Sequence, residues 1–234
     1  MKYFIAFVLV AGLCALAQAQ EQSCQVDVQS ACGQSANALM AFFSGESGVA
    51  NCNARYAAIG HLEHKMQDYI HLQLKKSYEY LLMATHFNSY QMNRPGFQKL
   101  YQGLSDRAFD DTIALIKQVT RRGGSVDFSK PHQQGVAQPP EVHLNELESL
   151  ARALDNEKEL TNGAIHVHTS ATHGTTDNRI HDPEMAHYLQ ENFLSKQAAS
   201  VRTLSGYAND LSKLVSVREP ALSVYLFDEY LQKQ

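Results

Sequence analysis

The stretch YIHLQLKKSYEYLLMATHF, residues 69–87, predicts an amphipathic helix whose buried face is interrupted by a glutamine. Residues recur on this face at alternating spacings of four and three, the period that keeps side chains on one side of a helix. Its members are Met66, Ile70, Gln73, Ser77, Tyr80, Ala84 and Phe87. Gln73 is therefore expected to point inward, and a buried amide must find hydrogen-bond partners.

Four long helical segments follow one another in the sequence. The first spans about residues 56–87 and the second about residues 96–122, separated by a turn at residues 93–96 that contains Pro95 and Gly96. The third spans about residues 141–169. The fourth opens at Asp182-Pro183, a capping aspartate followed by a proline at the first helical position.

A long connection separates the second and third segments. It reads SVDFSKPHQQGVAQPP at residues 125–140, which suits a crossover along the length of a bundle better than a tight turn. After Pro220, the amphipathic segment ALSVYLFDEYLQ predicts a short further helix. We therefore predict an all-α fold, a four-helix bundle with one long crossover and a short C-terminal fifth helix.

The N-terminus has the features of a secretory signal peptide, predicted at residues 1–19. Lys2 precedes an apolar run at residues 4–16 that is too short to span a bilayer comfortably, and small residues follow at the cleavage position. No second apolar run is long enough for a membrane span. We expect a chain that reaches the ER and Golgi lumen and the extracellular fluid, with no membrane partner.

Charge argues against a nucleic-acid partner. The formal net charge is -4 with His neutral, and Lys and Arg do not cluster. Binding to phosphate backbones needs clustered cations.

Three cysteines remain once the signal peptide and its Cys14 are removed, namely Cys24, Cys32 and Cys52. An odd number in an oxidising compartment leaves at least one thiol free or paired with another chain. We favour an interchain disulfide, and the alternative is one intrachain bridge with a buried free thiol. Three intrachain pairings are open.

Several motifs resemble ferritin, specifically the secreted insect type. They are HLQLKKSYEYLLM, GFQKLY, RRGG, DPEMAHYLQENFLSKQ and EPALSVYLFDEYL, which occur in order between about residues 60 and 231. The resemblance implies a ferritin-like bundle at residues 55–234, preceded by a Cys-bearing extension at residues 20–54. It also implies assembly into a hollow cage of two dozen chains that holds a ferric mineral.

Catalytic, heavy-type ferritins oxidise Fe(II) at a di-iron site of carboxylates, a histidine, a tyrosine and a glutamine. The resemblance places the corresponding positions at Gln73, Tyr80, Ala108, Asp111, Gln197 and, in the third helix, Leu154 or Asp155. Gln73 replaces a glutamate, and Ala108 and Asp111 replace a glutamate and a histidine. Too few anions remain to balance two ferrous ions inside a bundle. We expect a vestigial site, no enzymatic activity and no iron at a dedicated site in this chain.

Two further sets of positions follow from the resemblance. The cavity face that nucleates mineral in light-type ferritins keeps only two acids, Asp106 and Asp110, which predicts weak nucleation at best. The threefold-pore positions fall on His187 and Gln190, and neutral side chains make a poor funnel for cations.

Four histidines lie from the end of the third segment to the start of the fourth, at His166, His168, His173 and His181. We expect them in a solvated loop; metal binding by imidazoles is the weaker alternative.

The resulting hypothesis is a non-ferroxidase, light-type subunit of a secreted ferritin that co-assembles with a heavy-type subunit, with an interchain disulfide. Two alternatives stay open: an active ferroxidase with a rearranged ligand set, and a secreted helical-bundle binding protein that forms no cage.

Overall fold

The computed structural model describes residues 23–33, 51–129, 145–173, 181–216 and 220–234. The chain divides into two units, Met1–Ala54 and Arg55–Gln234. The predicted signal peptide and the part of the crossover beyond residue 129 lie outside the described residues.

The first unit contains one short helix and one disulfide. Helix α2 (Cys24–Gly33) is linked to the segment before the second unit by a bridge between Cys24 and Cys52. This intrachain bridge removes both cysteines as candidates for the interchain link and leaves Cys32. The backbone of Cys32 belongs to α2, but its side chain lies outside the described part.

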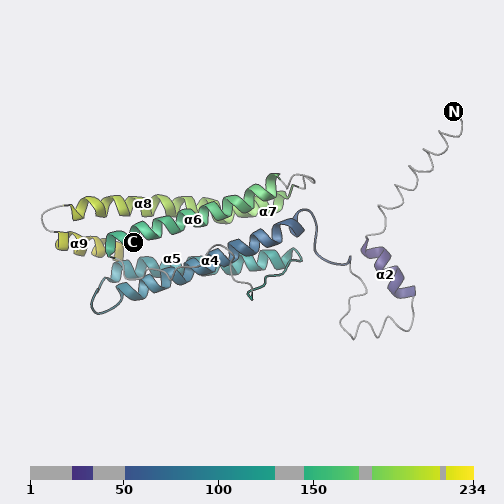
Figure 1. Ribbon diagram of the computed structural model, residues 1–234, viewed down its shortest axis with the longest axis horizontal. Coiled ribbons are helices and arrows are strands. Elements are labelled where there is room, and N and C mark those ends of the chain that lie inside the picture. Colours follow the sequence, from purple (N-terminus) through teal and green to yellow (C-terminus); the bar gives the residue numbers. More distant parts are fainter. Residues whose placement is uncertain (1–22, 34–50, 130–144, 174–180, 217–219) are drawn as a thin grey trace, which may run out of the picture. The chain divides into compact units, whose positions relative to one another are not determined.

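The second unit is an all-α bundle, as predicted (Figure 1). Its helices are α4 (Ile59–Phe87), α5 (Pro95–Arg121), α6 (Glu146–His173), α7 (Pro183–Leu189), the π-helical turn η2 (Gln190–Leu194), α8 (Ser195–Val215) and α9 (Pro220–Gln232). The described residues contain no strand. None of their helices is long and apolar enough to cross a membrane.

Contacts between helices establish their directions. Near the start of α4, Lys65 donates to Ser170 at the end of α6. Further along α4, Tyr80 donates to Glu157 in the middle of α6, so these two helices are antiparallel. At the turn between α4 and α5, the Phe87 ring at the end of α4 stacks on the Phe97 ring in the first turn of α5. Helices α4 and α5 are therefore antiparallel as well. α5 and α6 therefore run in the same direction, which requires the long crossover that the sequence predicts.

Helix α6 continues beyond its predicted end at residue 169, and the prediction of a loop for His166, His168 and His173 was wrong. The helix extends to His173 because buried apolar residues continue along one of its faces. Ala164, Val167 and Ala171 recur at helical spacing and are all buried. This burial holds the last turns of α6 against the bundle, with the three histidines outside its apolar face.

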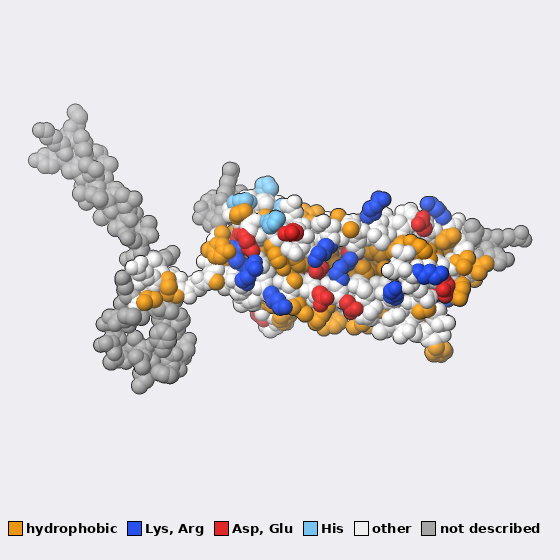
Figure 2. Space-filling view, turned by 180° about the vertical axis from the view of Figure 1, so that it is seen from behind, with side chains coloured by type: hydrophobic (Ala, Val, Ile, Leu, Met, Phe, Trp, Pro, Cys, Tyr) orange, Lys and Arg blue, Asp and Glu red, His pale blue; other side chains and the backbone are white. Residues whose placement is uncertain are grey.

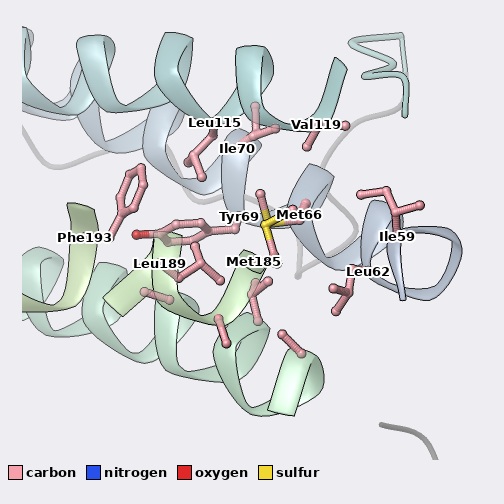
Figure 3. Close-up of a cluster of buried hydrophobic side chains, with 14 of the residues drawn as sticks. Ile59, Leu62, Met66, Tyr69, Ile70, Leu115, Val119, Met185, Leu189 and Phe193 are labelled. Carbon is pink, nitrogen blue, oxygen red and sulfur yellow. The ribbon is translucent and has the colours of Figure 1, made fainter. Parts of the chain in front are cut away.

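Two apolar clusters fill the bundle, one toward each end. The first is built around Met66, Ile70, Leu115 and Met185 (Figure 3). The second contains Phe87, Phe97, Tyr101, Leu204 and Phe227 among others. On α4 the first cluster ends at Leu72 and the second begins at Tyr80, so the middle of the bundle has a different composition.

The short helix α9 is held to the bundle by Asp228, which caps the N-terminus of α5. The buried carboxylate of Asp228 accepts hydrogen bonds from the backbone N–H groups of Gly96 (2.9 Å) and Phe97 (3.0 Å), at the start of α5. A Cβ at position 96 would lie 2.1 Å from the Asp228 carbonyl oxygen, so only glycine fits there. Since these N–H groups have no partner within their own helix, α9 completes α5.

One face of the molecule carries mixed charge. Figure 2 shows one face on which Lys and Arg side chains are interspersed with Asp and Glu, with His side chains gathered toward one end. On the face in this view, the interspersed charges form no extended cationic track of the kind that binds a nucleic acid.

Two helical glycines give opposite predictions for stability. A Cβ at Gly163 in α6 would lie 2.9 Å from Cδ2 of the buried Tyr69 ring, whereas one at Gly206 in α8 would meet nothing within 4 Å. We expect Gly206→Ala to raise the free energy of unfolding by about 0.5–1 kcal/mol through helix propensity. We expect Gly163→Ala to lower it by about 1–3 kcal/mol because the ring must move. Chemical denaturation of the two variants measures both, and equal gains would contradict the close packing of α4 and α6.

Candidate functional site

A layer of polar side chains separates the two apolar clusters at the middle of the bundle. We call it the polar layer. It comprises Gln73 and Ser77 of α4, Arg107 and Asp111 of α5, Glu157 of α6, and Gln197 and Ser200 of α8. The vestigial positions predicted from the sequence, apart from the third-helix position, fall in this layer or border it.

Glu157 is the fully buried acid of the layer. One carboxylate oxygen accepts from the Tyr80 hydroxyl at 2.9 Å, and the other accepts from the Arg107 guanidinium at 2.8 Å. The side chain of Glu157 is 0% exposed, whereas that of Arg107 is 33% exposed. Arg107 also donates to Ser200 at 3.1 Å, so one cation links α5 to both α6 and α8. Both oxygens of Glu157 are therefore already engaged by protein donors.

Tyr80 is held as a neutral phenol. Burial raises the pKa of Tyr80 well above its ordinary value, and the adjacent Glu157 carboxylate raises it further. A protonated phenol donates to a carboxylate, which is what the 2.9 Å contact requires. Tyr80 therefore acts here as a hydrogen-bond donor to the buried acid.

The two glutamines meet at a different tyrosine. Nε2 of Gln73 and Nε2 of Gln197 both donate to the Tyr69 hydroxyl, at 2.8 Å and 2.7 Å. Figure 3 shows Tyr69 among the apolar side chains of the first cluster. Burial raises the pKa of Tyr69, against the opposing effect of the hydrogen bonds from Gln197 and Gln73. The two Oε1 atoms are buried and accept no hydrogen bond from the described residues, so a water molecule would satisfy them.

Asp111 is half-buried at the edge of the layer. Desolvation raises the pKa of the Asp111 carboxyl to about 6, although Lys196 and Arg107 act to lower it. A carboxyl group is protonated in half of the molecules when the pH equals its pKa. Near pH 6, about half of the Asp111 side chains are therefore uncharged. Asp111 therefore offers less than a full negative charge in a weakly acidic compartment.

The side chains of the polar layer are a poor ligand set for two ferrous ions as substrate. Iron at such a site needs several carboxylates, both as hard oxygen ligands and as counter-charge. Glu157 is neutralised by Arg107, Ala108 has no ligand atom, and the two glutamine amides carry no charge. In the part of the chain that the structure describes, no three His, Cys, Asp or Glu side chains converge into a metal-binding group.

The third-helix prediction was wrong in register. Asp155 is 75% exposed and pairs weakly with Lys158 at 3.9 Å, and Leu154 packs partly buried against the second cluster. The inward acid is Glu157. A signal for it existed in the sequence, since Leu150, Ala153, Glu157, Leu160 and Ala164 recur at spacings of three and four.

The predicted nucleation and pore positions are on the surface. Asp106 and Asp110 are exposed one turn apart on α5, and Asp106 accepts from Gln102 at 2.8 Å. His187 and Gln190 are exposed on α7 and η2. The imidazole of His187 lies 3.2 Å from the carboxylate of Glu191, an acid that the sequence reasoning missed.

Comparison with known proteins gives consistent matches. Residues 63–214 match the ferritin-like domain of the ferritin family. The chain is 59% identical to the ferritin light chain of Drosophila melanogaster across 100% of both chains. It is 40% identical to the ferritin light chain of Trichoplusia ni across 90% of each. The crystal structure of Trichoplusia ni secreted ferritin matches with a TM-score of 0.80 and 39% identity, covering 91% of this chain and 99% of that one.

Removal of the Arg107 charge should destabilise the bundle strongly. Arg107→Ala leaves Glu157 buried without a cation, which we expect to cost about 3 kcal/mol or more in the free energy of unfolding. Arg152→Ala is the matched control, because Arg152 is 47% exposed and lies 3.9 Å from its acid, Glu79. We expect it to cost about 1 kcal/mol or less.

Chemical denaturation of the full chain measures these losses. The double variant Arg107→Ala/Glu157→Gln should recover part of the stability, because a neutral amide replaces the unpaired charge. Equal, small losses in Arg107→Ala and Arg152→Ala would show that the buried pair is not needed.

Proposed function

Because the chain belongs to the ferritin family, for which iron storage is implied, we propose that it is a non-ferroxidase, light-type subunit of a secreted ferritin cage. The observation that carries the proposal is the Arg107–Glu157 ion pair. The Arg107 guanidinium repels ferrous ions and pairs with Glu157, the fully buried carboxylate of the polar layer. Electrostatics therefore oppose the binding of two ferrous ions, each with two positive charges, beside it.

The remaining polar groups support the same function. The Gln73 and Gln197 amides share the Tyr69 hydroxyl, and Tyr80 donates to Glu157. These groups stabilise one another without a metal. In this proposal the set is the remnant of an iron site in which hydrogen bonds and one ion pair replace coordination.

A non-catalytic subunit needs a partner that oxidises iron. We propose co-assembly with a heavy-type ferritin subunit in a cage of two dozen chains. The ferric mineral would be cargo held by the assembled cage. The two insect relatives named as light chains and the relative named as a secreted ferritin favour this assignment, with the ER and Golgi lumen and the haemolymph as its location.

Cys32 is the proposed interchain link. The Cys24–Cys52 bridge uses the other two cysteines of the mature chain. The extension at residues 20–54 would thus carry both an internal bridge and a thiol for the partner, in a compartment that favours disulfides.

The surface positions take minor roles in this proposal. Asp106 and Asp110 provide one small acidic patch for mineral nucleation. His187 and Gln190 leave the pore region short of acids, and the nearby Glu191 offsets this only in part. Entry of cations would depend mainly on pores made by the partner.

Iron oxidation tests the proposal directly. We expect the purified chain to show no fast Fe(II) oxidation in stopped-flow absorbance, and Asp111→Ala to behave the same. A heavy-type subunit measured under the same conditions serves as the positive control. Fast turnover in the unmodified chain that is lost in Asp111→Ala would instead support an active ferroxidase with a rearranged ligand set.

A non-reducing gel of ferritin from the source, with sizing, tests the partnership. We expect elution as a cage, together with a band of about twice the chain mass that resolves into two different subunits under reductant. Cys32→Ser should abolish that band when the two subunits are co-expressed. Elution as a monomer or dimer would favour a secreted binding protein of the same fold.

A further inference from the structure

Disulfide pairing in the first unit poses a selection problem. Three cysteines allow three single bridges, and the structure contains the one between Cys24 and Cys52. We propose that Asp27 and Asn51 form a clamp that selects this bridge and thereby keeps Cys32 out of it. The selection is a property of this chain alone; only the later use of Cys32 toward a partner depends on the proposed function.

Helix α2 excludes the first competing pair. Cys24 and Cys32 lie eight residues apart on α2, a rise of about 12 Å along a helix. A disulfide requires Cα atoms within about 7 Å, so these two cysteines cannot bridge while the helix is formed. The bridge that forms has a Cα–Cα distance of 4.6 Å.

Loop-closure entropy does not exclude the second competing pair, Cys32 and Cys52. Cys24 and Cys52 are 28 residues apart, and Cys32 is closer to Cys52 in sequence. Loop closure depends weakly on length, so it favours the shorter Cys32–Cys52 loop by less than about twofold. A specific contact must therefore favour the longer loop.

The clamp supplies that contact beside the bridge. Asp27 lies one turn after Cys24 on α2, and Asn51 immediately precedes Cys52. One Asp27 oxygen accepts from the Asn51 backbone N–H at 2.7 Å, and the other accepts from the Asn51 side-chain amide at 3.3 Å. Hydrogen bonds to a carboxylate are stronger than neutral ones. They hold Cys52 beside the first turn of α2, where Cys24 lies, and away from the last turn, where the backbone of Cys32 lies.

The covalent step is ordinary thiol–disulfide exchange. Glutathione disulfide, or a disulfide-carrying oxidoreductase, accepts two electrons and two protons from the Cys24 and Cys52 thiols. One S–S bond forms in the chain as one breaks in the oxidant, which leaves as two thiols. The clamp does not alter this chemistry; it alters which two thiols are close when exchange occurs.

Differential alkylation of the full chain, expressed without a partner subunit, tests the clamp. The chain is equilibrated in a glutathione redox buffer and free thiols are blocked with N-ethylmaleimide. The monomeric band from a non-reducing gel is then reduced, alkylated with iodoacetamide and sequenced by tandem mass spectrometry. Interchain products, which concern the proposed function, do not enter this measurement.

We expect maleimide on Cys32 in the unmodified chain. In Asp27→Ala we expect the ratio of label on Cys32 to label on Cys24 to fall by about tenfold or more, because Cys32–Cys52 now competes. Asn51→Ala should change the ratio less, since it removes only the longer of the two hydrogen bonds.

Ser23→Ala controls for loss of the helix rather than loss of the clamp. The Ser23 hydroxyl accepts from the Val26 N–H at 3.3 Å, at the start of α2, and is not one of the two clamp residues. This variant should keep the label on Cys32. Label moving to Cys52 in Asp27→Ala would reveal a Cys24–Cys32 bridge, which forms only when α2 is unfolded, and would mean that Asp27 acts by stabilising the helix. An unchanged ratio would mean that the clamp selects nothing, and either result overturns the proposal.

Discussion

A carboxylate buried away from water must have positive charge or hydrogen-bond donors around it, and the middle of this bundle is organised by that requirement. Glu157 is 0% exposed and receives both the Arg107 guanidinium and the Tyr80 hydroxyl. Through Arg107 it also links α5 and α8. A buried ion pair adds little net stability compared with an apolar core, yet it fixes which side chains face one another. The relative placement of three helices thus depends on one acid.

The same ion pair bears on the function of the chain. A ferroxidase centre and an internal salt bridge compete for the same carboxylate, because both need its negative charge. In this chain the carboxylate is paired with arginine, and the glutamines beside it share a tyrosine hydroxyl. The polar groups of this layer therefore bond to one another. In the function proposed above, a subunit of this kind would contribute to the shell while a partner subunit oxidises iron.

The sequence predicted the helices better than the site, for physical reasons. Periodicity of three and four residues identified the buried face of α4, including Gln73, and the crossover followed from the length of the connection. The leucines of the third helix favoured Leu154, since apolar residues were weighed and the inward Glu157 was not. Tyr69 was missed because a tyrosine in an apolar stretch is typical of ordinary core. The disulfide pairing was not predictable from the spacing of three cysteines.

The cap that Asp228 places on α5 links the start of that helix to α9, a sequence separation of 132. On the ribosome, the first turn of α5 emerges long before its partner is synthesised. Water hydrates the amides of that turn until α9 has been synthesised and folds, so the first turn of α5 receives its cap late. A truncation that removes α9 would therefore also leave the start of α5, more than a hundred residues upstream, without its carboxylate cap.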